Sequence, residues 1–568
     1  MRRKQAAAAI ILAAASLGFA PAPSAAAAEP PTLDLVMTPH ATAGLDVSMT
    51  LAPPALKAGD PLVHLPLKLV GIPTARYDGD ALTARDDAGP LPLVQAEEPP
   101  TPQGIYRRWS VTRSTVGPVI VHYRAPPREI TAATNNGPLF DLRAEGGGFI
   151  GAGVGFVATP VRAGPYRVKM HWDLAHAPPG SFGTWSFGEG DVDQVLTADQ
   201  LAFSYYAVGP LKRYPAPARD HFALYWLSPP PFDPAALGER IHKLYAFMAD
   251  FFGDSDSSYR VFMRQNPYKG LGGTALAHSF MFGYEAAARP TVDSLQNHIS
   301  HEMTHNWPSL QGEHGDIAWY TEGTAEYYSL LLSYRAGALT TARYLDSLNE
   351  RAIGYYSNPY RALSNPEAAR IFWSDAIAQT VPYGRGFLYL MRTDAQIRGA
   401  SQGAHSLDDV VKALRKRQVA GQPYGVPEWL ALVGAEIGPE RAKREYDAMT
   451  SGALLVPPAD RYSPCFAMEQ TTTRPFELGF ARASLNDDRV VRGLQPESAA
   501  ARAGLRDGDV IVAVGDLEKV RADAAQPLTL KVRRAGAELE IAYTPRGAQV
   551  PAWRWTRNAA TPDAACRF

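Results

Sequence analysis

The stretch NHISHEMTHNWPSL, residues 297–310, places three histidines and a glutamate within eight positions. Its core, His301-Glu302-Met303-Thr304-His305, has the form H-E-x-x-H. On an α-helix, residues four apart lie on one face, so the imidazoles of His301 and His305 can reach one metal ion. Glu302 then lies beside the open coordination position, where a general base is needed. The stretch predicts a helical, catalytic metal site.

A second segment, AWYTEGTAEYYSLLL at residues 318–332, supplies a third ligand. Two histidines, a carboxylate and an open position are typical of a catalytic zinc site. We therefore expect one zinc ion per chain, bound by His301, His305 and Glu322. Glu326, one turn after Glu322, suits a carboxylate that orients a ligand imidazole. The alternative is that both glutamates are solvated helix charges.

The first 28 residues have the pattern of a cleaved signal peptide. MRRK is the basic end, AAAAIILAAASLGFA the apolar core and PSAAAA the small-residue cleavage region. The alternative, a membrane anchor, fits less well because the apolar run is short and rich in alanine. No later run approaches twenty apolar residues. We expect an exported, periplasmic protein without a membrane span in its mature form.

The remaining sequence indicates several domains, since 568 residues exceed what one core serves. Short alternating apolar runs predict an all-β, sandwich-like domain over residues 29–218. Residues 219–458 form a second domain: Asp233-Pro234 marks the start of its first helix, a strand-like run and a glycine-rich segment follow, and the chain is mostly helical from 293 to about 455. A β-rich pattern returns over residues 470–548, and a tail follows at 549–568. The net charge of −1 gives no electrostatic reason to expect nucleic acid as a partner.

The chain has two cysteines, Cys465 and Cys566. An even pair in an oxidising compartment predicts one disulfide, which would join the start of the C-terminal domain to the tail. Two buried thiols are the alternative.

The metal motifs carry a resemblance to a known family. The run from His301 to Trp307 and the tripeptide Thr321-Glu322-Gly323 resemble gluzincin (thermolysin-like) zinc metallopeptidases, in the branch of zinc aminopeptidases. This resemblance implies a thermolysin-like catalytic domain, α+β or mainly α, over residues 219–458. VPYGRGFLYL, residues 381–390, is similar to the aminopeptidase segment whose tyrosine stabilises the oxyanion, and that tyrosine corresponds to Tyr383.

The C-terminal sequence resembles a PDZ domain. FELGF, residues 476–480, is similar to a carboxylate-binding loop, which implies that Leu478, Gly479 and Phe480 bind peptide termini. Residues 490–516 continue the pattern. A β domain, a gluzincin core and a PDZ domain together resemble the glycyl aminopeptidase family. This resemblance implies peptide or protein substrates, with peptide termini bound at the PDZ domain by strand addition.

One departure from that family concerns the strand beside the cleft. The family has a Gly-Gly-x-Glu segment whose glutamate holds the substrate's α-amine. Here Gly272 and Gly273, which allow a substrate backbone to approach, are followed by Thr274-Ala275-Leu276-Ala277-His278-Ser279. The carboxylate is absent, so exopeptidase and endopeptidase specificity both stay open. Glu313 or Asp316 are the nearest substitutes in sequence.

Two further histidines have open roles. His298, one turn before His301, is either a fourth ligand that closes the metal site or part of the cleft wall or surface. His278 either lines the cleft or satisfies a loop. The complete ligand set favours an enzyme. The alternatives are an inactive scaffold that binds peptides through its PDZ domain, and a zinc enzyme that opens epoxides.

Overall fold

The computed structural model describes residues 29–568 except positions 42, 102–103, 133, 135–136, 220, 256, 269–270, 286, 288–289, 373–374, 376 and 486–487. The predicted signal peptide, residues 1–28, lies outside the described residues. The described chain divides into two compact units, one ending at Asn306 and the other beginning at Trp307. This division falls inside the range 219–458, directly after the helix that carries the H-E-x-x-H motif. No described helix is both long enough and apolar enough to cross a membrane.

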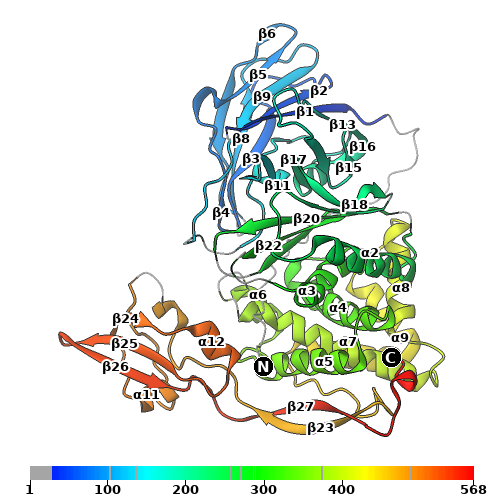
Figure 1. Cartoon of the computed structure of the whole chain (residues 1–568), viewed down its shortest axis with the longest axis vertical. Helices are drawn as coiled ribbons and strands as arrows, with labels where there is room; N and C mark the ends of the chain where they lie inside the picture. The colour runs from blue at the N-terminus through cyan, green and yellow to red at the C-terminus, as the bar shows by residue number, and fades with distance from the viewer. Residues whose placement is uncertain are drawn as a thin grey trace. The chain divides into compact units, whose positions relative to one another are not determined.

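The first unit begins with three β-sheets, drawn in blue to teal in Figure 1. In the largest sheet β1 pairs with β2 antiparallel and with β13 in parallel. Alternate residues of β1 (Leu33, Leu35 and Met37) are fully buried, as period-two patterning predicts. The strand order is β16-β13-β1-β2-β9-β5-β6: Val192–Thr197, Pro165–Trp172, Thr32–His40, Gly44–Leu51, Val119–Ala125, Leu82–Asp86 and Gly89–Pro90.

Two smaller sheets complete this β-rich part, which confirms the β-rich character predicted for the N-terminal part of the chain. One sheet has the order β12-β3-β8-β7 with β4 on β3: Thr159–Pro160, Pro61–Leu69, Gly104–Val111, Leu93–Glu97 and Ile72–Pro73. The other has the order β10-β11-β17-β14-β15: Arg143–Glu145, Gly148–Ala152, Tyr205–Gly209, Phe182–Trp185 and Gly188–Glu189. Three short turns of helix, η1, η2 and α1, link them at Gly79–Ala81, Gly153–Gly155 and Ala198–Ala202.

A five-stranded mixed sheet and two helices end the first unit. The sheet order is β18-β19-β20-β22-β21: Lys212–Arg219, Phe222–Trp226, Tyr259–Asn266, Ser279–Glu285 and Gly272–Leu276. The three central strands are parallel and almost continuously apolar, as strands buried on both faces are. Helix α2 (Pro234–Phe251) starts at the predicted cap, where the Asp233 carboxylate accepts from Ala235 N and Ala236 N. Helix α3 (Val292–Thr304) carries the metal motif.

The second unit is helical up to Thr450, which agrees with the helical prediction. The longest helices, α4 and α7, pack extensively on each other. The helices are α4 to α10 with the short turn η4: His314–Arg335, Thr341–Tyr356, Asn365–Ile371, Val381–Ala400, Leu407–Val419, Val426–Ile437, Pro439–Thr450 and, for η4, Ala378–Thr380.

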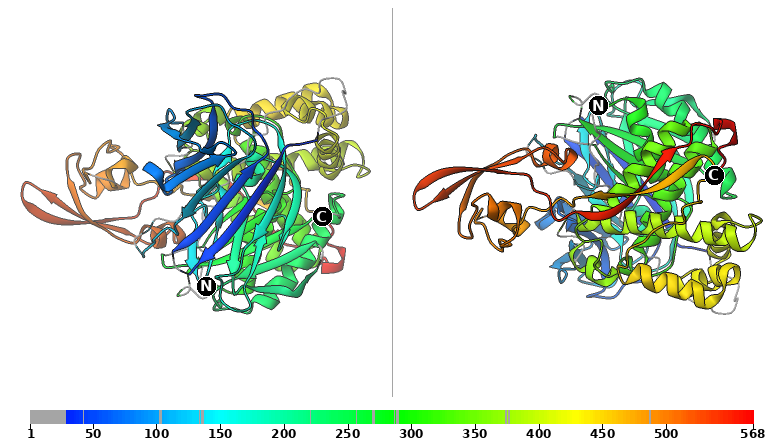
Figure 2. Two further views of the ribbon diagram at one scale, coloured as in Figure 1. Left: turned by 90° about the horizontal axis from the view of Figure 1, so that it is seen from above. Right: turned by 90° about the horizontal axis from the view of Figure 1, so that it is seen from below.

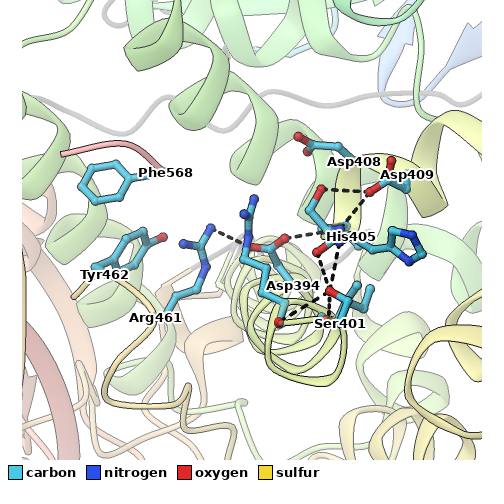
Figure 3. A network of polar contacts seen from close by, with 12 residues as sticks. Asp394, Ser401, His405, Asp408, Asp409, Arg461, Tyr462 and Phe568 are labelled. Atoms are coloured by element: carbon cyan, nitrogen blue, oxygen red, sulfur yellow. Dashed lines mark hydrogen bonds and ion pairs between the residues drawn. The ribbon is translucent and has the colours of Figure 1, made fainter. Parts of the chain in front are cut away.

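A buried carboxylate ties several of these segments together (Figure 3). Asp394 of α7 pairs with Arg461 Nη2 at 2.6 Å and Arg398 Nε at 2.9 Å. Its other oxygen accepts from Leu407 N at the start of α8, at 2.9 Å. Burial alone would raise the pKa of Asp394, but Arg461 and Arg398 hold that pKa below 3.8. The charged carboxylate therefore fixes α7, α8 and the segment before β23.

The C-terminal part is a two-stranded ribbon with a small domain inserted in it. Strands β23 (Phe466–Thr473) and β27 (Val550–Arg557) pair antiparallel and lie side by side in Figure 2, right. A disulfide joins Cys465, directly before β23, to Cys566 in the tail. Residues 549–568, predicted as a C-terminal tail, include strand β27 and η6 (Asp563–Ala565). The inserted domain has its own apolar core and contains η5, α11, β24, α12, β25 and β26: Arg482–Leu485, Ala499–Arg502, Val510–Val514, Leu517–Ala522, Leu528–Arg534 and Ala537–Tyr543.

Candidate metal centre

Helix α3 holds the two histidines of the motif in a ligand geometry. Leu295, Ile299 and Met303 recur every four residues and are fully buried, so they anchor one face of the helix. His301 and His305 lie one turn apart, with their Nε2 atoms 3.2 Å apart. Two ligands of one tetrahedral zinc ion are separated by about 3.3 Å when each zinc–nitrogen bond is about 2.0–2.1 Å. The imidazole pair therefore fits a shared zinc ion.

Glu322 completes a set of three donors with these histidines. One ligand atom from each of His301, His305 and Glu322 lies within 4.8 Å of the others. His301 and Glu322 are 5% and 2% exposed, so this set is largely removed from solvent. It is the one such group of three histidine, cysteine or acidic side chains among the described residues, and it does not include His298. Two imidazoles and a carboxylate are the donors that catalytic zinc sites use.

Glycines fix the helix that presents Glu322. A Cβ added to Gly386 of α7 would lie 1.9 Å from the carbonyl oxygen of Trp319 on α4. A Cβ added to Gly323, the neighbour of Glu322, would lie 2.6 Å from the backbone of Gly386. The two backbones thus cross in direct contact, which only glycine allows. Tyr383, half-buried in the first turn of α7, lies one turn before this crossing.

Three other predicted residues lie near the ends or faces of these helices. The carboxylate of Glu326 forms an ion pair with Arg351 of α5 at 2.5 Å. The predicted contact of Glu326 with a ligand imidazole stays a prediction. Glu313 caps α4, its carbonyl accepting from Asp316 N and Ile317 N. Glu313 and Asp316 are exposed at the helix N-terminus, where negative charge is stabilising.

Glu302 is fully buried, and its negative charge adds to burial in raising the pKa of two buried tyrosines. Burial raises the pKa of Tyr259 well above 10, and the negative charge of Glu302 raises it further. Burial likewise raises the pKa of Tyr205, with a smaller contribution from Glu302. Both phenols therefore stay neutral at any physiological pH and can act only as hydrogen-bonding groups.

His298 of α3 packs directly against Gly273 of β21. A Cβ on Gly273 would lie 2.3 Å from the ring of Phe280 and 2.5 Å from His298 Nε2. The His298 ring also packs edge-on against Phe280, with ring centroids 5.6 Å apart. Gly273 is thus needed where α3 lies over β21. Its neighbour Gly272 is buried and pairs with Gly283 of β22.

His278 belongs to a hairpin turn. It is exposed, has a φ of 48°, and follows Ala277 in the two-residue connection between β21 and β22. Its carbonyl accepts from Arg260 N at 3.1 Å, and its ring packs edge-on against Phe187. These contacts match the expected alternative in which His278 satisfies a loop.

The predicted carboxylate loop lies at the start of the inserted C-terminal domain. Leu478 and Phe480 are buried in its core, and Gly479 has a φ of 82°. A Cβ on Gly479 would lie 2.6 Å from the Ser498 side chain, so glycine is required there. The segment that follows the loop, Arg482–Leu485, forms a 3₁₀ helix instead of a strand. The expected binding mode by strand addition therefore lacks a strand directly after the loop.

A small, mainly apolar hollow borders the site residues of the second unit. On α4 it includes Ala318, one turn before Glu322, and on α7 it ends at Pro382, directly before Tyr383. Burial lowers the pKa of His314 in its wall, which keeps that imidazole neutral at pH 7. The lining residues are His314, Gly315, Ala318, Asn365, Ala368, Ala369, Phe372, Val381 and Pro382.

One buried residue beside the predicted Tyr383 was not identified in the sequence. Arg385, two positions after Tyr383, is 1% exposed, and its Nη2 donates to the carbonyl of Arg361 at 3.0 Å. It also donates to Asn365 Oδ1 and to the carbonyl of Leu363. Arg385 thus holds the loop before α6 against the start of α7. Its signal in the sequence is an arginine between two glycines, Gly384 and Gly386, in a helix that is otherwise apolar there.

Comparisons with known proteins give a family match over part of the chain and a likeness in fold. A family model described as M61 glycyl aminopeptidase matches residues 306–380. No curated protein sequence matches the chain. Among solved structures, an aminopeptidase N family protein from Idiomarina loihiensis has a TM-score of 0.63 and 17% identity, covering 92% of this chain and 98% of that one. This likeness shows the fold.

Two further solved structures are similar over a smaller part of the chain. The M1 zinc metallopeptidase from Deinococcus radiodurans has a TM-score of 0.45 and 19% identity, covering 76% of this chain and 96% of that one. The yeast LTA4 hydrolase has a TM-score of 0.46 and 14% identity, covering 76% of this chain and 68% of that one. The M61 match, the aminopeptidase-like fold and the His-His-Glu cluster together support a peptidase.

Proposed function

We propose that this protein is an exported, zinc-dependent metallopeptidase related to the glycyl aminopeptidases. The observation that carries the proposal is the convergence of one ligand atom each from His301, His305 and Glu322 within 4.8 Å. These residues would hold one zinc ion per chain. A zinc ion bound there supplies a water molecule whose pKa is lowered toward 7.

The protein's own side chains supply the remaining chemistry. Glu302, buried beside His301, accepts the proton of the attacking water and passes it to the leaving amine. Tyr383 donates a hydrogen bond to the oxygen of the scissile carbonyl as negative charge develops on it. Arg385 and the glycine crossing of α4 and α7 set the position of Tyr383, because they fix the first turn of α7.

We propose that the C-terminal domain is a PDZ domain that binds peptide termini through its loop at Leu478, Gly479 and Phe480. Among the described residues, the backbone N–H groups of these three positions form no hydrogen bond. Three neighbouring free donors suit a carboxylate. Since η5 follows the loop, the terminus is held by these donors without an added strand.

The proposal of export rests on the signal-like N-terminal sequence and on the disulfide between Cys465 and Cys566. Disulfides persist in oxidising compartments such as the periplasm. The test is to express the full chain and compare the N-terminal sequence of the periplasmic product with cleavage near Ala28. An uncleaved product retained in the cytoplasm contradicts the proposal.

The zinc and the reaction are tested together by two variants. Glu302→Gln should keep one zinc ion per chain but lose nearly all turnover of a mixed peptide library, because the ligands remain while the base is lost. His301→Ala should lose the metal after mild chelation, because two ligands hold zinc weakly. Metal analysis and mass spectrometry of the digest give both readouts. Full zinc content in His301→Ala, or full turnover in Glu302→Gln, would overturn the assignment.

A further inference from the structure

The loop between α5 and α6 is fastened to the segment that precedes α7 by one buried amide. Asn358, two residues after α5, is 6% exposed. Its Nδ2 atom donates to Thr380 Oγ1 at 2.9 Å and to the carbonyl of Ile377 at 3.2 Å. Its Oδ1 atom accepts from Tyr360 N at 2.8 Å, within the loop itself. Both ends of the amide are thus used, one on the loop and the other at η4.

A carboxylate makes a second link between the same two segments. Asp375 Oδ2 accepts from Tyr360 Oη at 2.9 Å. Its Oδ1 atom accepts from Ile377 N at 2.7 Å and from Ala378 N at 3.3 Å, at the start of η4. Asp375 therefore holds the start of η4, whereas Asn358 holds its end. We call Asn358 and Asp375 the clamp.

The clamp lies directly before the predicted oxyanion donor. Helix α7 begins at Val381, immediately after η4, so Tyr383 follows Thr380 by three residues. At a rise of about 1.5 Å per residue, the backbone of Tyr383 lies about 4.5 Å along the axis from that of Thr380. The backbone of Val381 is helical, so η4 and α7 form one continuous piece. A shift of η4 is therefore passed on to Tyr383.

The same loop also holds α7 after Tyr383. Arg385 Nη2 donates to the carbonyl of Arg361 at 3.0 Å. A Cβ added to Gly384 would lie 2.8 Å from the Cβ atom of Tyr355, near the end of α5. Tyr383 thus lies between fixed points on both sides, with the clamp before it and Gly384 and Arg385 after it.

We propose that Asn358 and Asp375 are positioning residues for peptide hydrolysis, because they hold the hydroxyl of Tyr383 where the oxyanion forms. This inference rests on the proposed function, in which Tyr383 donates to that oxygen. A preorganised donor works only within a narrow range of geometry, and a misplacement of about 1 Å can lower the rate by about 10²-fold. Neither clamp residue is among the proposed metal ligands, so loss of the clamp slows the reaction and leaves the metal bound.

The first test is Asn358→Ala in the full chain, with kcat, KM and zinc content measured. The substrate is the peptide that the parent cleaves fastest in a mixed peptide library. We expect kcat to fall about ten- to hundredfold, KM to stay within about twofold and one zinc ion per chain to remain. Unchanged kcat in Asn358→Ala would overturn the role of the clamp. No cleavage by the parent would instead contradict the proposed function.

Asn349→Ala is the matched control for the loss of an amide. Asn349 lies on α5 and makes two hydrogen bonds of 2.8 Å with the backbone of Trp555 in β27. Its loss should lower the melting temperature and leave kcat within about twofold. An equal fall in kcat in both variants would show that general loosening, and not the position of Tyr383, slows the reaction.

A double variant shows whether Asn358 acts through Tyr383. In Tyr383→Phe the hydroxyl that the clamp positions is absent. Adding Asn358→Ala to it should therefore lower kcat by no more than about twofold further, since residues that act as a unit are not additive. If the two losses multiply, Asn358 acts on another part of the site and the proposal is wrong.

Tyr360→Phe tests the second half of the clamp, because it removes the phenol that donates to Asp375. We expect kcat to fall about three- to tenfold, the usual effect of one lost hydrogen bond, with KM unchanged. Full kcat in this variant would remove Asp375 from the proposal.

Thr380 offers a test with less risk to folding, because it is exposed. Thr380→Val removes the hydroxyl that joins Asn358 to η4, and Thr380→Ser keeps it. We expect kcat to fall about three- to tenfold in Thr380→Val and to stay within about twofold of the parent in Thr380→Ser. Equal kcat in the two variants, at equal melting temperatures, would overturn the link between Asn358 and η4.

Discussion

At the scale of single residues, a substitution of Tyr383 distinguishes a catalytic role of its hydroxyl from a packing role of its ring. It is half-buried in the first turn of α7, within one turn of the crossing that positions Glu322. Tyr383→Phe removes the hydroxyl and no carbon atom. Loss of one oxyanion donor lowers kcat by about 10²–10³, equivalent to about 2.7–4 kcal/mol. We expect that loss in steady-state peptide hydrolysis, with little change in melting temperature.

Tyr389 on the same helix is the matched control. It is 1% exposed, and its hydroxyl accepts from Trp429 Nε1 at 3.1 Å. Tyr389→Phe should therefore reduce stability by about 1 kcal/mol and leave kcat unchanged. If Tyr383→Phe behaves in the same way as this control, Tyr383 has only a packing role.

A buried carboxylate in the first unit predicts a dependence of stability on pH. Asp141 pairs with Arg143 Nε and Arg264 Nη2, each at 2.7 Å. Burial alone would raise the pKa of Asp141, but the two guanidinium groups outweigh burial and lower the pKa to about 2. Because this value lies below the 3.8 of the unfolded chain, the stabilisation is complete above about pH 4 and is lost as the pH falls toward 2.

Asp141→Asn should destabilise the first unit by about 3–5 kcal/mol at pH 7, because Arg264 is fully buried and would lose its counter-charge. The cost should shrink at pH 2–3. Urea unfolding at both pH values measures it. Asp193→Asn breaks an exposed pair with Arg167 and should cost less than about 1 kcal/mol at either pH. A penalty for Asp141→Asn that does not change with pH would contradict the ion-pair account.

At the scale of helices and strands, two glycines, Gly323 and Gly386, decide where Glu322 and Tyr383 lie. A Cβ on Gly386 would lie 1.9 Å from the carbonyl of Trp319. Gly386→Ala should therefore separate α4 from α7 and destabilise the second unit by about 1–3 kcal/mol, the usual cost of overpacking. Turnover should fall as well, since Glu322 and Tyr383 flank this crossing.

Gly399, near the end of α7, is the control for helix propensity. A Cβ there has no atom within 4 Å. Gly399→Ala should be neutral or stabilise the protein by up to about 1 kcal/mol. Chemical denaturation of the two variants, with kcat measured in parallel, tests the contrast. Equal stabilities would show that the helices can move apart without loss.

These elements also show what the sequence can and cannot predict. The metal motif predicts its helix because i, i+4 spacing places His301 and His305 on one face whatever the surrounding fold. The cap at Asp233 is equally local. The role of His298 cannot be predicted from neighbouring residues in the sequence, because it depends on β21 packing under α3 at Gly273. The hydrogen bond from Ala277 N, after β21, to the carbonyl of Phe203 is not local either, because Phe203 lies seventy-four positions earlier in the sequence.

At the scale of the whole chain, the ribbon of β23 and β27 fastens the C-terminal region to the helical unit. Asn349 of α5 donates to the carbonyl of Trp555 and accepts from Trp555 N, each at 2.8 Å. Phe568 packs against Tyr344 and Tyr462, with ring centroids 4.8 and 5.0 Å apart. Arg335 Nε donates to the carbonyl of Phe568 at 2.9 Å. The chain end is thus part of the packed structure.

The disulfide between Cys465 and Cys566 closes this arrangement, and its removal gives the last prediction. The two cysteines are 101 positions apart. For a loop of this length the chain-entropy model gives at most about 4–5 kcal/mol of stabilisation. A double variant, Cys465→Ala with Cys566→Ala, should lower the melting temperature of the helical unit by several degrees. Turnover at 25 °C should change little, because Asn349, Arg335 and the aromatic contacts still hold the ribbon and the chain end. A dithiol reductant should lower the melting temperature of the parent to that of the variant and leave the variant unaffected. If reductant destabilises both proteins equally, the effect does not come from this bond. If the variant melts at the parent's temperature, the contacts of Trp555 and Phe568 alone fix the C-terminal region.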